Sequence, residues 1–194
     1  MEDDLHRLRE RENSRITNKQ TKDETQQYTE VFRIDEYLSR IMPAADTNFK
    51  DASSFTEKVL QNIAQELKIV QGMFFLLKKT DDEDDEGTFL PIGQYAYFSE
   101  KQPRGFKLGE SLSGQVAKNR QALNLKDLPE GYVTIISGLG KSAPRNLIIA
   151  PVVLEDNCIG VIEVASFKTF DENEEKLINR ICESMANRLN ELRN

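Results

Sequence analysis

The stretch "LIIAPVVLEDNCIGVIEVAS" (residues 147–166) contains two apolar runs separated by a short polar turn. The runs at 147–154 and 158–166 are rich in Ile and Val, which favour strands. Between them lie Glu155, Asp156 and Asn157, a length that fits a hairpin connection. Because apolar residues follow one another with little alternation, both faces of these strands should be covered. The stretch therefore predicts the centre of an antiparallel sheet.

Earlier segments of the chain extend this sheet. "VQGMFFLLKK" (70–79) predicts a buried strand, and "TFLPIGQYAYF" (88–98) predicts its antiparallel return. The intervening acidic run "DDEDDE" (81–86) lacks the Gly and Glu that a calcium loop needs at its sixth and twelfth positions, so we interpret it as a solvated turn. The segment 106–121 predicts a short strand, a glycine turn and a short helix, and a brief strand is expected at 122–125.

Long helices are expected at both ends of the chain. The ten glycines lie between Gly72 and Gly160 and the six prolines between Pro43 and Pro151, which leaves the first 42 and the last 34 residues without helix breakers. We predict one long helix or two end to end over 3–42, which either pairs with a copy of itself as a weak coiled coil or is a frayed, solvated tail. Further helices are predicted over 54–68, with a capping box of Ser54 and Glu57, and at the C-terminus, with one of Thr169 and Glu172. The predicted organisation is a helical segment, 1–42, followed by a globular domain, 43–194.

Charge and composition exclude several classes of protein. The net charge is −7, but "DDEDDE" supplies six negative charges, so the remainder sums to −7 − (−6) = −1, without the basic stripe that nucleic-acid binding requires. The chain has neither an apolar run long enough to cross a membrane nor an apolar signal region, which predicts a cytoplasmic location. Cys158, Cys182 and His6 are too few for a typical zinc site, and the cysteines are interpreted as free thiols.

The segment "SGLGKS" (137–142) resembles the end of a phosphate-binding loop but fails on both sides. Ile135 stands where the first Gly of a Walker A loop should be, and Ala143-Pro144 disfavours the helix that should follow. A dinucleotide-binding Gly pattern fails as well, because Ala143 replaces its third Gly. We interpret the glycines as flexible joints after the apolar "YVTII" (132–136).

Three segments in order carry a resemblance to a known family. "FKLGESLSGQVAKNRQALNLKDLPEGY" (106–132), "SGLG" (137–140) and "APVVLEDNCIGVIEVASFKTF" (150–170), followed by an amphipathic helix, resemble a GAF domain over about 51–194. The likeness is greatest to GAF regions of bacterial signalling proteins such as sensor histidine kinases.

The resemblance implies an α+β fold. It has a central antiparallel sheet of about six strands, the first and last helices on one face, and a small-molecule pocket on the other face under a cover that matches 132–140. It also implies a homodimer formed through the N- and C-terminal helices, with residues 3–42 as a signalling helix. The signal would pass to an output module such as a kinase or phosphatase, and the chain would be cytoplasmic or the cytoplasmic part of a membrane-anchored sensor that itself contacts no membrane.

Several GAF subfamilies are disfavoured by the residues at their key positions. Free methionine sulfoxide reductases use pocket cysteines, whereas the "GESLSG" turn here carries Ser111 and Ser113. Haem sensors need an axial histidine, and His6 lies outside the domain; bilin attachment needs a cysteine, and Cys182 falls on an apolar helix stripe. "FDENEE" (170–175) matches the cyclic-nucleotide pattern only in part, and a helix start with favourable acidic residues explains it better.

Candidate ligand-binding residues come from the predicted strands and the pocket cover. Tyr95 and Tyr97 should share one strand face, and Glu163 is a carboxylate among apolar residues that needs a partner, either Arg145 or a ligand amine. Ordinary packing on the sheet remains an equal alternative for the tyrosines, and backbone donors for Glu163. The complete candidate set is Tyr95, Tyr97, Tyr132, Ser137, Gly138, Leu139, Arg145 and Glu163.

No catalytic residue, metal ligand or specific cofactor is predicted, because no nucleophile and base form a convincing pair and the domain lacks histidine. We expect a regulatory, non-enzymatic module that binds an unidentified small molecule or relays a conformational signal. Two alternatives stay open: a thiol redox enzyme of the same fold, and a dimerisation unit whose pocket is filled by its own side chains.

Overall fold

The computed structural model describes residues 33–79, 86–98, 103–129, 131–137 and 140–192. The chain divides into two compact units, 1–36 and Tyr37–Asn194, and each is considered by itself. Of the predicted N-terminal helix, residues 33–41 are helical, and the prediction for 3–32 lies outside the described residues. The boundary predicted between residues 42 and 43 stays a prediction.

The larger unit is an α+β fold around an antiparallel sheet, as predicted. The sheet has five strands in the order β2-β1-β7-β6-β3, all antiparallel to their neighbours. Their bounds are β1 (Gln71–Lys78), β2 (Thr88–Tyr95), β3 (Leu123–Lys126), β6 (Asn146–Leu154) and β7 (Asn157–Ser166). The expected count was about six; β4 (Ile135–Ser137) and β5 (Gly140–Ser142) instead pair with each other in a separate two-stranded sheet.

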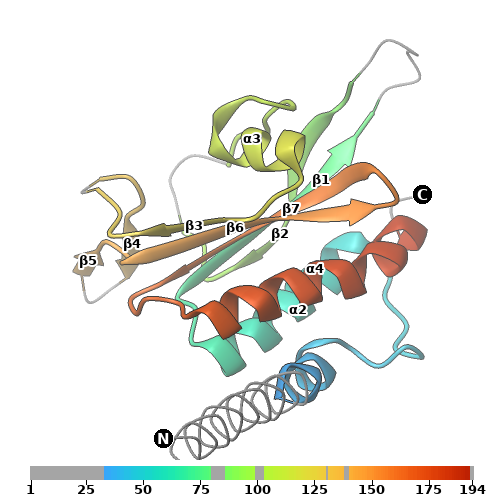
Figure 1. Cartoon of the computed structure of the whole chain (residues 1–194), viewed down its shortest axis with the longest axis horizontal. Coiled ribbons are helices and arrows are strands. Elements are labelled where there is room, and N and C mark those ends of the chain that lie inside the picture. The colour runs from blue at the N-terminus through green and yellow to red at the C-terminus, as the bar shows by residue number, and fades with distance from the viewer. Residues whose placement is uncertain (1–32, 80–85, 99–102, 130, 138–139, 193–194) are drawn as a thin grey trace, which may run out of the picture. The chain divides into compact units, whose positions relative to one another are not determined.

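Helices cover the two faces of the sheet differently. Figure 1 shows α2 (Ala52–Leu67) and α4 (Glu172–Leu192) side by side on one face and the short α3 (Ser111–Asn119) on the other. This is the arrangement that the sequence predicted for the first and last helices of the domain. We call the two sides of the sheet the helix face and the α3 face.

The helix face is a closed apolar layer. Alternate residues of the three central strands point to it, and their side chains are fully buried: Phe74, Leu76, Ile148, Ala150, Ile162 and Val164. From α2 and α4 come Phe55, Val59, Leu60, Ile63, Ile178, Ile181, Met185 and Leu189, which are also buried. Gly93 is required where α2 crosses β2, because a Cβ there would lie 2.3 Å from the Thr56 hydroxyl oxygen.

The helix starts differ from the predicted capping boxes. The N-cap of α2 is Asp51, whose carboxylate accepts a hydrogen bond from the Ser54 amide at 2.9 Å while the Ser54 hydroxyl receives one from the Asp51 amide. Before α4, Asp171 accepts from the Glu174 amide and Glu174 accepts from the Asp171 amide. The predictions based on Ser54 and Thr169 as N-caps were therefore wrong by three and two residues, since in both places an aspartate closer to the true start accepts the amide protons.

A buried asparagine ties the sheet edge to the start of α4. Asn146, fully buried, donates to the Asn124 side chain and to the Leu125 carbonyl oxygen, and its own carbonyl oxygen accepts the Phe170 amide at 2.7 Å. Asn124 in turn donates to Glu175 of α4. This network satisfies every polar atom of the Asn146 side chain inside the fold.

Two broader properties of the described part of the chain bear on function. None of its helices combines the length and apolar character that crossing a membrane requires. Its His, Cys, Asp and Glu side chains also form no group of three or more with the geometry to bind a metal ion.

Candidate functional site

The α3 face holds a cavity of about 420 Å³, within the range of about 300–1,000 Å³ typical of small-molecule sites. Its floor comes from alternate residues of β1 and β7, chiefly Met73, Phe75, Glu163 and Ala165. The sides are formed by Tyr97, Phe98, Pro103 and Arg104 after β2, by residues 132–134 before β4, and by Ile136 of β4. The cavity therefore lies on the face where the family resemblance implied a pocket, opposite α2 and α4.

Glu163 is the ionisable group on the cavity floor. It lies on β7 opposite Met73 of β1 and Ile149 of β6, so its nearest neighbours across the sheet are apolar. The Ser113 hydroxyl of α3 donates to its Oε1 atom at 2.5 Å. Burial raises the pKa of the Glu163 carboxyl, and the Ser113 hydrogen bond opposes that rise.

Of the two strand tyrosines, Tyr97 lines the cavity and Tyr95 does not. The expectation that they share a face was wrong because β2 ends at Tyr95 and Ala96 has a left-handed backbone, with φ of 50°. Strand alternation stops there, so it no longer relates residue 97 to residue 95. Tyr95 lies opposite Gly72 in the sheet, and a Cβ at Gly72 would point toward Leu60 of α2. Because residues paired across a sheet point to the same face, the Tyr95 side chain is on the helix face.

The segment expected to cover the pocket does lie beside it. Tyr132, Val133, Thr134 and Ile136 line the cavity, with Tyr132 47% exposed at its mouth. Burial, and second the negative charge of Glu163, raise the pKa of the Tyr132 hydroxyl. Of the glycine-containing stretch, the Ser137 backbone belongs to β4, whereas its side chain and the predictions for Gly138 and Leu139 lie outside the described residues.

Arg145 is not the partner of Glu163. It is exposed, it does not line the cavity, and its backbone pairs with Asp127 and Ser166 at the beginning of β6. The neighbouring Asn146 takes the buried position at this point of the chain, which leaves the Arg145 side chain in solvent. The carboxylate instead receives a hydrogen bond from Ser113, which projects from the buried side of α3 together with Val116 and Ala117.

Sequence reasoning missed Ser113, Phe98 and Arg104 as site residues. Ser113 carried a usable signal, since a serine three residues before Val116 falls on the apolar side of the short helix. Phe98 and Arg104 line the cavity but lie outside the strands, so strand periodicity does not indicate the direction of their side chains.

A second depression, of about 1020 Å³, lies at the other end of the sheet beside the β6–β7 turn. It is the larger of the two, but its lining includes exposed residues of both charges, among them Lys78, Arg120, Glu155 and Asp156. Cys158 lines it and is buried, and burial raises the pKa of its thiol to about 11. We favour the smaller cavity because it combines apolar walls with a few convergent polar groups.

Comparison with known families agrees with the fold and its cavity. The GAF domain family model matches residues 50–190, most of the chain. The chain belongs to the GAF family. None of the curated proteins compared with this GAF domain matches it.

Solved structures show the same fold at low sequence identity. The GAF domain of a phosphoenolpyruvate-protein phosphotransferase from Coxiella burnetii has a TM-score of 0.64 at 17% identity, with 81% of this chain and 93% of that chain covered. A type II free methionine-R-sulfoxide reductase from Thermoplasma acidophilum has a TM-score of 0.54 at 20% identity, with coverage of 73% and 94%. A GAF domain of A. aeolicus in an inactive state has a TM-score of 0.57 at 20% identity, with coverage of 87% and 99%. Similar structures thus include a methionine-R-sulfoxide reductase and isolated GAF domains of other proteins.

Proposed function

We propose that this chain is a regulatory GAF module that binds a small molecule in the cavity on the α3 face and catalyses no reaction. The observation that carries the proposal is the cavity itself: about 420 Å³, walled by aromatic and apolar side chains, with Glu163 on its floor. Folding alone gives no reason to retain a carboxylate there, because burying one among apolar residues is unfavourable.

The helices that border the sheet offer a route for the signal. The cavity floor is formed by β1 and β7, and the same strands pack through their other face against α2 and α4. We extend the proposal to a homodimer formed through the N- and C-terminal helices, with residues 3–42 as a signalling helix and a kinase or phosphatase as the output module. Such a module would resemble those of bacterial two-component sensors and would act in the cytoplasm.

A thiol redox enzyme is the rival function, because structures of free methionine-R-sulfoxide reductases share the fold. Against it, Cys158 and Cys182 are both buried, and neither lines the cavity on the α3 face. Burial raises the pKa of both thiols, that of Cys158 to about 11, so the reactive thiolate is scarce near neutral pH.

Thiol labelling separates these two functions. With an alkylating reagent at pH 7.5, we expect both cysteines of the native protein to react at least about a hundredfold more slowly than in denaturant. A cysteine that reacts in the native protein as fast as an unfolded thiol would favour the redox enzyme.

Ligand binding is tested by native mass spectrometry after incubation with a deproteinised cell extract. We expect a discrete additional mass of a small molecule on the folded protein. A protein that retains no compound from extracts of several sources would favour the purely structural dimerisation unit. Light scattering of the full chain tests the dimer, and a monomer at micromolar concentration would remove that part of the proposal.

A further inference from the structure

The chemistry of the cavity floor indicates what its ligand carries. Glu163 shares its strand face with Val161 and Ala165, and the residues paired with it across the sheet are Met73 and Ile149. Ser113 donates to its Oε1 atom. A carboxylate in such surroundings has more acceptor capacity than one hydroxyl donor fills, since two oxygens provide about four lone-pair sites.

The cavity walls complement this negative charge with aromatic rings. Phe75 lies beside Glu163 on the floor, and Tyr97, Phe98 and Tyr132 form the sides. Phe98 is 62% exposed, which is unusual for such a large apolar side chain and places it at the mouth. Aromatic faces attract cations through their negative centre, and a carboxylate attracts the same cations by its full charge.

We propose that this cavity binds a small molecule through a protonated amine and that the Glu163 carboxylate is the group that receives the amine. The inference rests on the proposed function and specifies its ligand class. A primary ammonium provides three donors on one positive charge, which matches an acceptor-only carboxylate in an apolar setting. The amine replaces the water that an ionised Glu163 would otherwise need in the cavity.

The other polar and charged groups of the lining refine the ligand class. Tyr97 and Tyr132 contribute hydroxyls to the lining, Ser113 of α3 donates to Glu163, and Arg104 is the cationic side chain among the described lining residues. Arg104 is exposed, on the segment that follows Phe98, so it lies toward solvent rather than on the floor. A ligand with a carboxylate as well as an amine would place the carboxylate toward Arg104. The shared chemistry is the amine, and its source is either a simple amine or a zwitterionic amino acid.

Ionisation of Glu163 should couple to amine binding. Because burial raises its pKa in the free protein, the carboxyl gains a proton at a higher pH than an exposed glutamate does. A bound ammonium stabilises the ionised form and lowers this pKa again. Amine affinity should consequently fall as the pH is lowered through the raised pKa.

Three probes with the same phenyl body test the inference by calorimetry or ligand-observed NMR at millimolar concentration. They are 2-phenylethylamine, with an amine alone; phenylalanine, with an amine and a carboxylate; and 3-phenylpropionate, with a carboxylate alone. We expect at least one amine to bind and 3-phenylpropionate not to bind. Glu163→Gln keeps the size of the side chain and an acceptor for Ser113, and should weaken amine binding by at least about tenfold.

Two further variants complete the experiment. Glu155→Gln removes a negative charge from the exposed β6–β7 turn and should leave amine binding unchanged. If the ligand is an amino acid, Arg104→Ala should weaken the binding of phenylalanine but not that of 2-phenylethylamine. If the ligand is a simple amine, Arg104→Ala should change the binding of neither probe.

The inference is overturned if 3-phenylpropionate binds as tightly as the amines, if none of the probes binds, or if Glu163→Gln leaves amine binding intact. Its failure differs from that of the proposed function. If a neutral or anionic compound is retained from a cell extract, the proposed regulatory function stands and the amine ligand is excluded. If no compound is retained, both proposals fail.

Discussion

On the helix face of the central sheet, apolar side chains from three strands meet apolar stripes of α2 and α4, and Phe74, Ile148 and Ile162 are fully buried there. On the α3 face, the same strands present Met73, Phe75 and Ala165 together with Glu163 to a cavity bordered by partly exposed rings. One sheet thus has a closed side, on which α2 and α4 lie (Figure 1), and an open side with the cavity.

Polar groups on the two sides also differ. Asn146 is buried near the start of α4, and three hydrogen bonds satisfy its side chain within the fold. Glu163 has its hydrogen bond from Ser113 and otherwise lines a cavity. A polar group satisfied inside the protein serves the structure, whereas one with unused acceptor capacity in a cavity is suited to a ligand.

The largest expected effect is on the closed side. Phe74→Ala should lower the free energy of unfolding by about 3–5 kcal/mol, because it leaves a void where α2 and α4 meet the sheet. Tyr97→Ala, its counterpart on the open side, should cost less than about 1 kcal/mol, since Tyr97 is only partly buried. Urea denaturation of both variants checks this, and equal losses would contradict the division into a closed and an open side.

Asn146→Ala should cause the next largest loss of stability. It leaves the buried Phe170 amide and the partly buried Leu125 carbonyl oxygen without their partner, at a total cost of about 1–3 kcal/mol. Lys126→Ala, at the exposed end of β3, is a suitable control with little expected change. Thermal unfolding measures both variants, and a stability near that of the wild type for Asn146→Ala would show that solvent replaces the network.

Ser113→Ala should lower stability at pH 8 by about 1–2 kcal/mol, because the ionised Glu163 then loses its donor. The same change should raise the pKa of Glu163 further, which NMR titration of its side chain can follow. Ser111→Ala, at the exposed start of the same helix, is the control for the pKa, because the Ser111 hydroxyl accepts from the Gly114 amide instead of donating to Glu163. A pKa of Glu163 that is unaltered in Ser113→Ala would mean that the hydrogen bond is not maintained in solution.

Glu163→Gln should have the smallest effect on stability, and in the favourable direction. A carboxyl whose pKa is raised by folding contributes most to stability when it is protonated, and this contribution is lost as the pH rises through the raised pKa. The variant should therefore be more stable than the wild type at pH 8, and the difference should shrink toward pH 4. Paired thermal unfolding curves across this range test the sign, and a variant less stable at pH 8 would indicate that Glu163 is a structural group.

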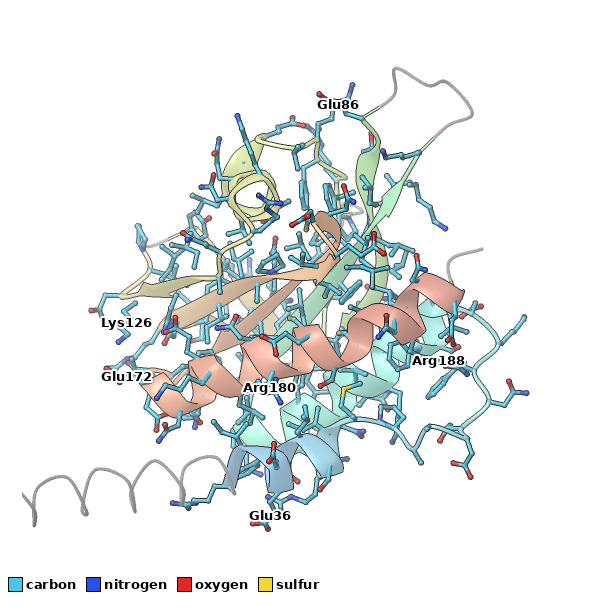
Figure 2. The ribbon with its side chains drawn as sticks, turned by 45° about the vertical axis from the view of Figure 1, so that its right-hand side comes forward. Glu36, Glu86, Lys126, Glu172, Arg180 and Arg188 are labelled. Carbon is cyan, nitrogen blue, oxygen red and sulfur yellow. The ribbon has the colours of Figure 1, made fainter. Side chains whose placement is uncertain are left out.

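Much of the closed side could be predicted from the sequence. The apolar runs of β1, β6 and β7 and the helical stripes of α2 and α4 are local patterns that bury the same residues in any compact arrangement. Figure 2 shows Arg180 and Arg188 on α4. Each forms an exposed ion pair with the glutamate three positions further along, Glu183 and Glu191, as expected for the polar side of an amphipathic helix.

The open side could be predicted only in part. Tyr97, Tyr132 and Glu163 were among the predicted residues and do meet at the cavity, whereas Tyr95 and Arg145 lie elsewhere. Their misplacement has local causes that a periodic pattern does not contain: the left-handed Ala96 at the end of β2, and the burial of Asn146 in place of its neighbour. Ser113 reaches Glu163 across fifty positions of sequence, a contact that depends on the assembled fold.

The most direct test of the account compares ligand retention in two leucine variants by native mass spectrometry. Ala165→Leu adds three carbon atoms at the cavity floor, and Ser184→Leu places a leucine on the exposed side of α4. After incubation with the same deproteinised cell extract, wild type and Ser184→Leu should carry an identical additional mass that Ala165→Leu, still folded by circular dichroism, lacks. Retention of that mass by a folded Ala165→Leu variant, or its absence from the wild type, would contradict the assignment of the cavity on the α3 face as the ligand site.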